Sequence, residues 1–353
     1  MKEKHSQVSG NHIALYRKYR PTQFKDVLGQ DHVVSVLEHT IESNSISHAY
    51  IFAGTRGTGK TSIARIFARA IGSLGSDIYE IDAASNRGID DVRSIRDSVQ
   101  TLPFESKYKV YIIDEAHMLT KEAWNAFLKT LEEPPSYVVF ILATTEIEKI
   151  PETVLSRCQV FQFKKPNLST LEKVVSSIAK KEGREIDKEA SELIAILGDG
   201  SFRDTQGILD TLLSSTDTRI AIDDVARITG APQSDLVHNF ISAVSQKKTE
   251  DALTCIHAVV SQNVSISIWL KMVLQKMRFV MLVKYGGAHM QLVVKESMGE
   301  EEYKRIFDIS QTEGGITSHH ILKLLSCYEA LKNSFRPELL VELAVIEMFE
   351  LKK

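Results

Sequence analysis

The stretch Gly54-Thr55-Arg56-Gly57-Thr58-Gly59-Lys60-Thr61 decides the fold of this chain. It fits the phosphate-binding loop pattern, in which a glycine and four further residues precede Gly-Lys-Thr. An apolar run at residues 48–53 leads into it as a predicted buried strand, and residues 62–70 leave it as a predicted helix. The pattern requires this context of strand, loop and helix. The stretch therefore predicts a loop that binds the polyphosphate of a nucleotide.

The residue types of this loop suit phosphate and magnesium binding. Its glycines let backbone N–H groups turn toward a polyphosphate at the positive end of the following helix. Lys60 is expected to reach the terminal phosphates, and the Thr61 hydroxyl is expected to ligate Mg²⁺. The predicted nucleotide-binding residues of the loop are Gly54, Thr55, Arg56, Gly57, Thr58, Gly59, Lys60, Thr61 and Ser62.

Length and composition indicate a folded chain of several domains. The 353 residues suggest two or three domains, and the hydrophobic share of 43% is ordinary for a globular protein. A net charge of −3 means that any nucleic-acid contact must come from a local basic patch. Three scattered cysteines and the lack of a membrane-length apolar run or secretion signal predict a cytoplasmic protein without a zinc site.

Four further apolar runs have the length of strands, at residues 77–82, 109–114, 137–143 and 159–163. Helical segments separate them, which predicts right-handed crossovers and a mostly parallel five-stranded sheet with helices on both faces. Ligands of such α/β sheets bind beyond the carboxyl ends of the strands.

Polar residues follow two of these strands. Asp114 ends one strand and is placed to hold Mg²⁺, while the adjacent Glu115 is placed to polarise the attacking water. Thr144 and Thr145 end the next strand and can orient water or the terminal phosphate, although threonine is also a common strand residue. Arg157 precedes the last strand, and by itself it is typical of a surface cation.

The amino-terminal segment permits two interpretations. Residues 1–12 are predicted to be a loose tail, and residues 15–21 an extended or turn segment, because Pro21 disfavours helix before it. The aromatic side chains of this segment can stack on a base and Arg20 can reach a phosphate or a neighbouring subunit. Alternatively, the segment is a strap packed on the core.

From residue 166 the pattern becomes helical, with a predicted capping box at residues 169–172 and helices at 187–197 and 202–214. Arg203 lies in a first helical turn, where the helix dipole disfavours a cation, so it is expected to bind an anion outside this helix. Helical patterns continue to the last residue, and the final helix is apolar on more than one face. The predicted domains are residues 1–165, 166–218 and 219–353.

The order of these motifs resembles the AAA+ ATPases, and specifically the gamma/tau subunits of the bacterial DNA polymerase III clamp loader. The similarity covers nearly the whole chain and is most specific at residues 16–21, 81–86, 129–135, 156–158 and 200–204. It implies an α/β P-loop domain, a three-helix lid domain and an all-α collar domain. It also implies ATP hydrolysis that loads a sliding clamp onto primed DNA, in a pentameric ring with other subunits.

The resemblance implies further residue roles. Arg157 would reach the ATP of the adjacent subunit, Arg203 would sense the nucleotide of its own chain, and Thr144 or Thr145 would be a sensor. The region facing DNA would carry Arg87, Arg93 and Arg96, although a solvated face explains them equally well. The implied adenine pocket consists of Tyr19, Arg20, Pro21 and Val27.

Two departures from the family pattern bear on these expectations. The four-cysteine zinc module is replaced by residues 71–76, so no zinc is expected. The chain also ends after the collar helices, and thus resembles the short, gamma-like form or a truncated version. Three alternatives stay open: a non-hydrolysing stator subunit, a helicase suggested by residues 114–117, and a structural protein with vestigial nucleotide binding.

Overall fold

The computed structural model describes residues 13–216, 218–232, 234–298, 300–331 and 334–350, so the predicted tail at residues 1–12 lies outside the described residues. The chain divides into two compact units. The first is Met1–Val174 with Gly198–Gly207, and the second is Val175–Leu197 with Ile208–Lys353. The division falls within helices α7 (Leu168–Lys181) and α9 (Phe202–Ser215).

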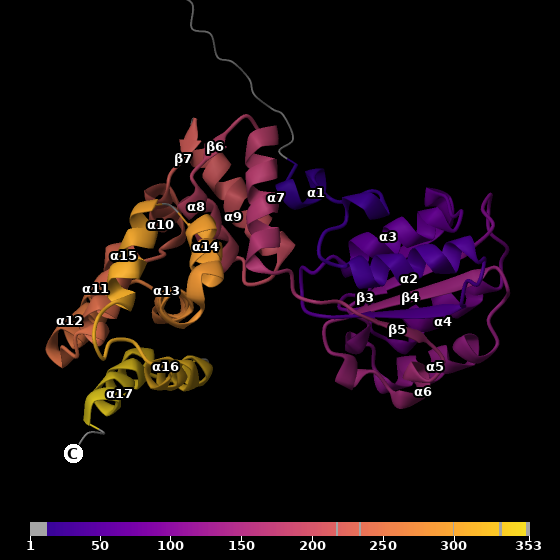
Figure 1. Ribbon diagram of the computed structural model, residues 1–353. Coiled ribbons are helices and arrows are strands. Elements are labelled where there is room, and N and C mark those ends of the chain that lie inside the picture. Colours follow the sequence, from indigo (N-terminus) through magenta and orange to yellow (C-terminus); the bar gives the residue numbers. More distant parts are fainter. Residues whose placement is uncertain (1–12, 217, 233, 299, 332–333, 351–353) are drawn as a thin grey trace, which may run out of the picture. The chain divides into compact units, whose positions relative to one another are not determined.

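A five-stranded parallel sheet forms the centre of the first unit (Figure 1), which confirms the predicted α/β architecture. The strand order is β2-β3-β4-β1-β5. The strands are β1 (Ala49–Ala53), β2 (Ile78–Asp82), β3 (Lys109–Asp114), β4 (Val138–Thr144) and β5 (Gln159–Gln162). Each begins and ends within two residues of its predicted bounds.

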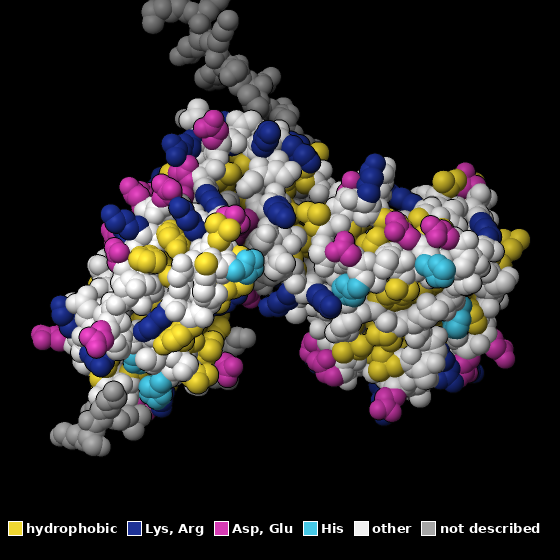
Figure 2. Space-filling view, in the orientation of Figure 1, with side chains coloured by type: hydrophobic (Ala, Val, Ile, Leu, Met, Phe, Trp, Pro, Cys, Tyr) yellow, Lys and Arg dark blue, Asp and Glu magenta, His cyan; other side chains and the backbone are white. Residues whose placement is uncertain are grey.

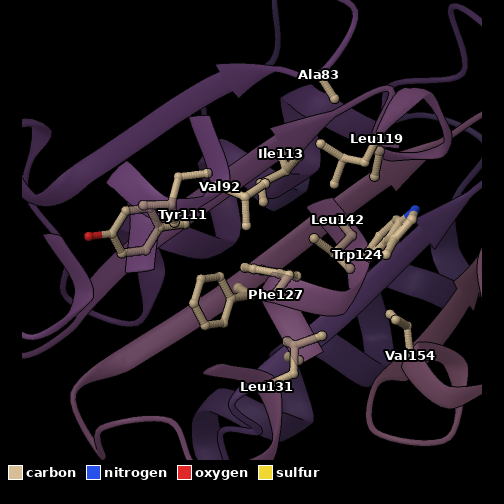
Figure 3. Close-up of a cluster of buried hydrophobic side chains, with 14 of the residues drawn as sticks. Ala83, Val92, Tyr111, Ile113, Leu119, Trp124, Phe127, Leu131, Leu142 and Val154 are labelled. Carbon is tan, nitrogen blue, oxygen red and sulfur yellow. The ribbon is translucent and has the colours of Figure 1, made fainter. Parts of the chain in front are cut away.

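Helices cover both faces of this sheet, because neighbouring side chains of a strand point to opposite sides. Tyr50 and Phe52 of β1 pack with α2 and α3, whereas Ile51 packs with α4 and α5. Figure 3 shows this second face, where Tyr111 and Ile113 of β3 meet the aromatic side chains of α5. The helices are α2 (Asp31–Glu42), α3 (Lys60–Ala70), α4 (Ile89–Val99), α5 (Lys121–Glu132) and α6 (Glu152–Leu155), with single 3-10 turns at η2 (Gly75–Asp77), η3 (Ala116–Met118) and η4 (Ile147–Lys149).

The amino-terminal segment corrects one prediction. Residues expected to be extended form a single helical turn, α1 (Leu15–Lys18), followed by the 3-10 helix η1 (Phe24–Asp26). Pro21 restricts the residue immediately before it, and α1 ends two residues earlier than that, so the proline is compatible with the helix. Phe24 and Val27 pack against the core on the α2 and α3 face. Within residues 15–21 only Leu15 is buried, at 4% exposed, which agrees with the strap interpretation and does not decide between the two.

The second unit is mainly helical, but it contains a two-stranded parallel sheet of β6 (Glu185–Ile186) and β7 (Arg219–Ile220), which the helical pattern did not predict. Strands this short have no readable periodicity. The sequence pattern predicts helices at residues 235–245, 249–261, 265–284, 318–333 and 337–351, and it does not single out α10, α14 and α15. The helices of this unit are α8 (Lys188–Leu197), α10 (Ile222–Thr229), α11 (Ser234–Ser245), α12 (Thr249–Ser261), α13 (Ile266–Tyr285), α14 (Gly287–Ser297), α15 (Glu300–Ser310), α16 (Ser318–Ala330) and α17 (Pro337–Glu350).

Helix α13 lies at the core of this unit, and Trp269, Val273 and Met277, whose spacing of four residues in the sequence predicts one apolar stripe, are buried along it. The predicted capping box of α7 is wrong. Asn167 Oδ1 accepts the Thr170 N–H at 2.8 Å, while Ser169 lies inside the helix. An asparagine is as good a cap as a serine, and here it precedes the helix by one residue.

A polar cluster joins α11, α13 and α15 inside the second unit. Lys276 forms an ion pair with Glu302, and His238 Nε2 lies 2.7 Å from Glu302 Oε2. Burial by itself raises the pKa of Glu302, but the hydrogen bond with His238 and the charge of Lys276 outweigh it and lower the pKa to about 2. The ionised carboxylate therefore stabilises the folded unit.

We expect this contribution to depend on pH. Because the folded pKa of Glu302 lies below the unfolded value of about 4.3, the stabilisation is fully present above about pH 4.3. It is lost as the pH falls toward 2. In urea melts, Glu302→Gln should cost roughly 3 kcal/mol at pH 6 and almost nothing at pH 2. The exposed neighbour supplies the control, Glu301→Gln, and an equal cost at both pH values would contradict the assignment.

Basic and acidic side chains are interspersed over the face shown in Figure 2. This distribution agrees with the small net charge of −3. Among the described residues, no helix is both long enough and apolar enough to cross a membrane.

Candidate nucleotide-binding site

The loop at residues 54–61 connects the carboxyl end of β1 to the amino end of α3. Gly59 precedes α3 with φ 98°, a left-handed conformation that favours glycine, and a Cβ there would meet nothing within 4 Å. Gly57 has φ 74°, and a Cβ on it would lie 1.9 Å from Ser201 Oγ. The loop is thus open at the helix terminus, where a phosphate would bind, and is packed closely at its tip.

Lys60 is folded into the loop. Its side-chain nitrogen donates to Gly54 O at 2.7 Å and to Thr55 O at 3.0 Å. Burial lowers the pKa of Lys60, and the charges of Glu115 and Asp114 oppose this shift. Phosphate oxygens carry negative charge and are stronger acceptors than these carbonyls, so the ammonium is placed to exchange one set of partners for the other.

Thr61 and Asp114 lie side by side, as the sequence predicted for a magnesium site. Thr61 Oγ1 donates to Asp114 Oδ2 at 2.7 Å. Hydroxyl and carboxylate oxygens are ligands that Mg²⁺ prefers, with its remaining positions taken by water and phosphate. These two residues therefore fit the ion.

The residues after β3 and β4 lie next to the loop. Ala53 is opposite Thr144 in the sheet, and Gly54 N donates to Thr144 O at 3.1 Å. Thr145 Oγ1 donates to Glu115 Oε2 at 3.1 Å. The structure therefore brings both threonines and Glu115 to the edge of the sheet that carries the phosphate-binding loop.

The predicted adenine-pocket residues are half-buried near the same edge. Burial and the charge of Arg65 lower the pKa of Arg20, while Glu80 and Asp114 raise it. The charge of Arg203 also lowers the pKa of Arg20. The Arg203 guanidinium lies 4.9 Å from the ring centroid of Tyr16. The Arg203 segment meets the loop directly, because Phe202 N donates to Gly57 O at 2.9 Å. The role of Tyr16 as a platform for Arg203 was missed, since only the folded chain brings the two together.

Arg157 lies at the opposite edge of the sheet. Gln159, at the start of β5, is opposite Tyr50 near the start of β1, whereas the loop follows the end of β1. At about 3.3 Å per residue, the length of β1 separates Arg157 from the loop by at least roughly 10 Å. Its guanidinium donates to Thr153 O and to Glu132 Oε1, both at 2.7 Å. Arg157 is therefore separated from the phosphate site of its own chain.

The candidate DNA-binding arginines are exposed on α4 and just before it. Arg93 pairs with Asp90 at 2.9 Å, and Arg96 pairs with Asp97 at 3.1 Å. These acidic partners weaken the positive field around the arginines. DNA binding by the three arginines therefore stays a prediction.

The loop after α4 is a surface feature that the sequence analysis missed. Leu102 is 73% exposed and Phe104 is 85% exposed. The buried carboxylate of Asp77 holds this loop by accepting the N–H groups of residues 104–106. Isolated exposed apolar side chains are common on soluble proteins, so these two residues do not by themselves define a protein-binding surface. Two apolar residues flanking Pro103 in a polar stretch were the available signal.

The absence of zinc stays a prediction. Among the described residues, no group of three or more histidine, cysteine or acidic side chains is arranged to hold a metal ion. Burial raises the pKa of Cys158 to about 12 and that of Cys327 to about 11, so both are neutral thiols at neutral pH. Elemental analysis after chelator treatment should find less than about 0.1 zinc per chain, and a stoichiometric amount would contradict the prediction.

The fold and the phosphate-binding loop define the chain as an AAA+ protein. It is similar to the RuvB Holliday junction branch migration motor of Thermotoga maritima, with a TM-score of 0.51 and 20% identity over 70% of this chain and 86% of that one. At this identity the likeness concerns the fold alone.

Sequence comparison identifies the family. The chain is 33% identical to the DNA polymerase III subunit gamma of Buchnera aphidicola, over 78% of this chain and 80% of that protein. It is 35% identical to the subunit tau of Bacillus subtilis, over 95% of this chain and 63% of that protein. Residues 29–82 and 75–167 match the family described as DNA polymerase III, delta subunit. The chain belongs to the DNA polymerase III gamma/tau subunit family, and it spans less than two thirds of the length of the Bacillus relative.

Proposed function

We propose that this chain hydrolyses ATP as a subunit of a clamp loader, and that hydrolysis drives the loading of a sliding clamp onto primed DNA. The observation that carries the proposal is the convergence of Lys60, the Thr61–Asp114 pair and Glu115 at one edge of the sheet. This set supplies a phosphate-binding cation, two ligands for Mg²⁺ and a carboxylate that can polarise water. The relatives are named as the tau and gamma subunits of DNA polymerase III, and a clamp-loading role suits a subunit of such a polymerase.

The proposed roles follow from these positions. Lys60 neutralises the terminal phosphates, and Glu115 orients the attacking water. Thr145 contacts Glu115 directly, so it is the better placed of the two threonines to act as the sensor. Arg203, on its Tyr16 platform, senses the nucleotide. The half-buried segment that contains Tyr19, Arg20, Pro21 and Val27 borders the adenine.

The proposal extends to domains and partners. Residues 1–165, 166–218 and 219–353 would form the ATPase, lid and collar domains. The collar would hold the chain in a pentameric ring with other subunits in the cytoplasm, where the ring binds clamp and primed DNA. On α17, Leu339 and Leu343 are 46% and 47% exposed, and such side chains can be covered by a neighbouring subunit. Arg87, Arg93 and Arg96 are the proposed DNA contacts.

Two of the alternatives are distinguished by specific features. A stator subunit does not hydrolyse ATP, so it needs no carboxylate placed to polarise water. This chain has such a carboxylate in Glu115, which accepts a hydrogen bond from Thr145. A helicase requires a second core domain with its own arginines, whereas the second unit of this chain is mainly helical.

One assay tests the proposal and the structural alternative together. ATP turnover is measured for the full chain in the assembled ring, with and without primed DNA and clamp. We expect turnover that rises when both are added. Absence of turnover under all conditions would favour a stator or a structural role, and stimulation by DNA that is independent of the clamp would favour the helicase alternative.

A further inference from the structure

His117 lies among polar side chains that follow the ends of β3 and β4, next to the 3-10 helix η4. Its side chain is only 6% exposed. Nδ1 lies 3.1 Å from Thr144 Oγ1 and 3.5 Å from Glu115 Oε2. Nε2 lies 3.2 Å from Glu146 Oε1. One imidazole therefore contacts a candidate sensor threonine and the water-polarising carboxylate on one side, and a surface carboxylate on the other.

Glu146 lies on the outer side of His117. Its carboxylate oxygens can only accept hydrogen bonds, so Nε2 would be the donor in any hydrogen bond across the 3.2 Å contact. Glu146 is itself held by the hydrogen bond and charge of Lys149, which lower its pKa, and by the charge of His117. Nδ1 then faces the Thr144 hydroxyl, whose oxygen accepts the Glu146 N–H at 3.1 Å. The imidazole is thus fixed from both sides.

Glu115 has an unusual backbone conformation and a side chain held by two neighbours. Its φ of 49° lies in the left-handed region, which costs roughly 1 kcal/mol or more for a residue with a side chain. The Thr145 hydroxyl donates a hydrogen bond to Glu115 Oε2 at 3.1 Å. Nδ1 of His117 lies 3.5 Å from the same oxygen. These two contacts restrict the carboxylate to a narrow range of orientations.

We propose that His117 is a positioning residue for ATP hydrolysis, which orients the Thr144 hydroxyl and the Glu115 carboxylate from its anchor on Glu146. This inference rests on the proposed function, because it assigns His117 an effect on the same reaction. His117 acts through Glu115 and Thr144, so its loss should slow the chemical step and leave nucleotide binding intact. A displacement of about 1 Å at a reacting group is sufficient to lower a rate by about 100-fold.

Three substitutions separate the two ends of the imidazole. In His117→Ala both contacts are lost, and kcat should fall by about 10-fold to 100-fold while the Kd for ATP changes by less than about 2-fold. The amide in His117→Asn can occupy the position of Nδ1, and should restore kcat to within about 5-fold of the wild type. The longer amide in His117→Gln reaches toward Glu146 and should restore less.

Glu146 tests the anchor independently. Glu146→Ala should lower kcat by about 3-fold to 10-fold, because the imidazole keeps its inner contacts but loses its fixed orientation. The double variant with His117→Ala should be no slower than His117→Ala alone, since the two residues act as one unit. Met118→Ala, in the same 3-10 helix with a side chain 39% exposed, is the matched control and should keep wild-type kcat.

The possible outcomes separate the role of His117 from the proposed function on which that role rests. Wild-type kcat in His117→Ala, together with a large loss in Glu115→Gln, would overturn the role of His117 and leave the proposed function intact. Losses of kcat that merely follow the melting temperature across all three His117 variants would show a structural role and would also overturn it. Absence of ATP turnover in the wild-type ring would overturn both.

Discussion

Replacing Arg157 with alanine is expected to lower ATP hydrolysis by roughly 10³-fold or more, which is the effect of losing an arginine finger in other nucleotide hydrolases. The guanidinium lies at the amino edge of the sheet, whereas the phosphate-binding loop lies at the carboxyl edge. We therefore expect it to complete a site only when a second subunit brings its own nucleotide to it. Arg157→Ala chains should still bind ATP and assemble.

Mixing experiments test whether the site is shared. Arg157→Ala and Lys60→Ala chains each lack a different half of a shared site, so mixed rings should recover part of the activity at interfaces with an intact loop and an intact finger. Arg227→Ala removes another exposed arginine that is paired with a carboxylate, and should leave turnover unchanged. If Arg157→Ala alone keeps wild-type turnover stimulated by DNA, or if no mixing ratio restores activity, the shared-site mechanism is wrong.

The ion pair of Arg157 with Glu132 adds a detail to this prediction. In the free chain, Glu132 Oε1 accepts a hydrogen bond from Arg157 at 2.7 Å, and the arginine side chain is 35% exposed. A phosphate of a neighbouring nucleotide offers more charge to the same guanidinium, so we expect assembly to compete with this pair. Glu132→Gln should therefore keep turnover within about 3-fold of the wild type, since an exposed pair contributes little energy.

The second large effect is expected within the phosphate-binding loop. Lys60→Ala removes the cation that we expect to bind the terminal phosphates and should abolish hydrolysis, while Glu115→Gln removes only the proposed activation of water. Glu115→Gln should therefore bind ATP normally and turn it over about 10²-fold to 10⁴-fold more slowly. Measured side by side, ATP affinity and single-turnover rate distinguish the two roles.

A surface variant serves as the control for both measurements, and two results would contradict the role of Glu115. Lys121→Ala removes an exposed lysine at the start of α5 and should behave as the wild type in both measurements. Full turnover in Glu115→Gln would refute the assignment of that carboxylate. Weakened ATP binding in Glu115→Gln, equal to the loss of turnover, would indicate that Glu115 contributes to nucleotide binding instead.

Much of the first unit was predicted correctly because its signals are local. Apolar runs of five to seven residues separated by helical segments identify strands whatever their partners, and the strands match their predicted ranges closely. The Thr61–Asp114 contact was also predictable, since carboxyl ends of parallel strands share one edge of the sheet. The errors fell where local signals compete or are short, at α1, at the cap of α7 and at the two-residue strands β6 and β7.

The sequence by itself determined the phosphate-binding loop, the parallel sheet and the identity of the residues at its carboxyl edge. Only the tertiary structure decided the strand order, the placement of Arg203 over Tyr16, the pair of Arg157 with Glu132 and the network around His117. The physical reason is the range of the interactions. Periodicity and capping act over a few residues, whereas these contacts join segments far apart in the sequence, and their geometry is set by how the helices and strands pack.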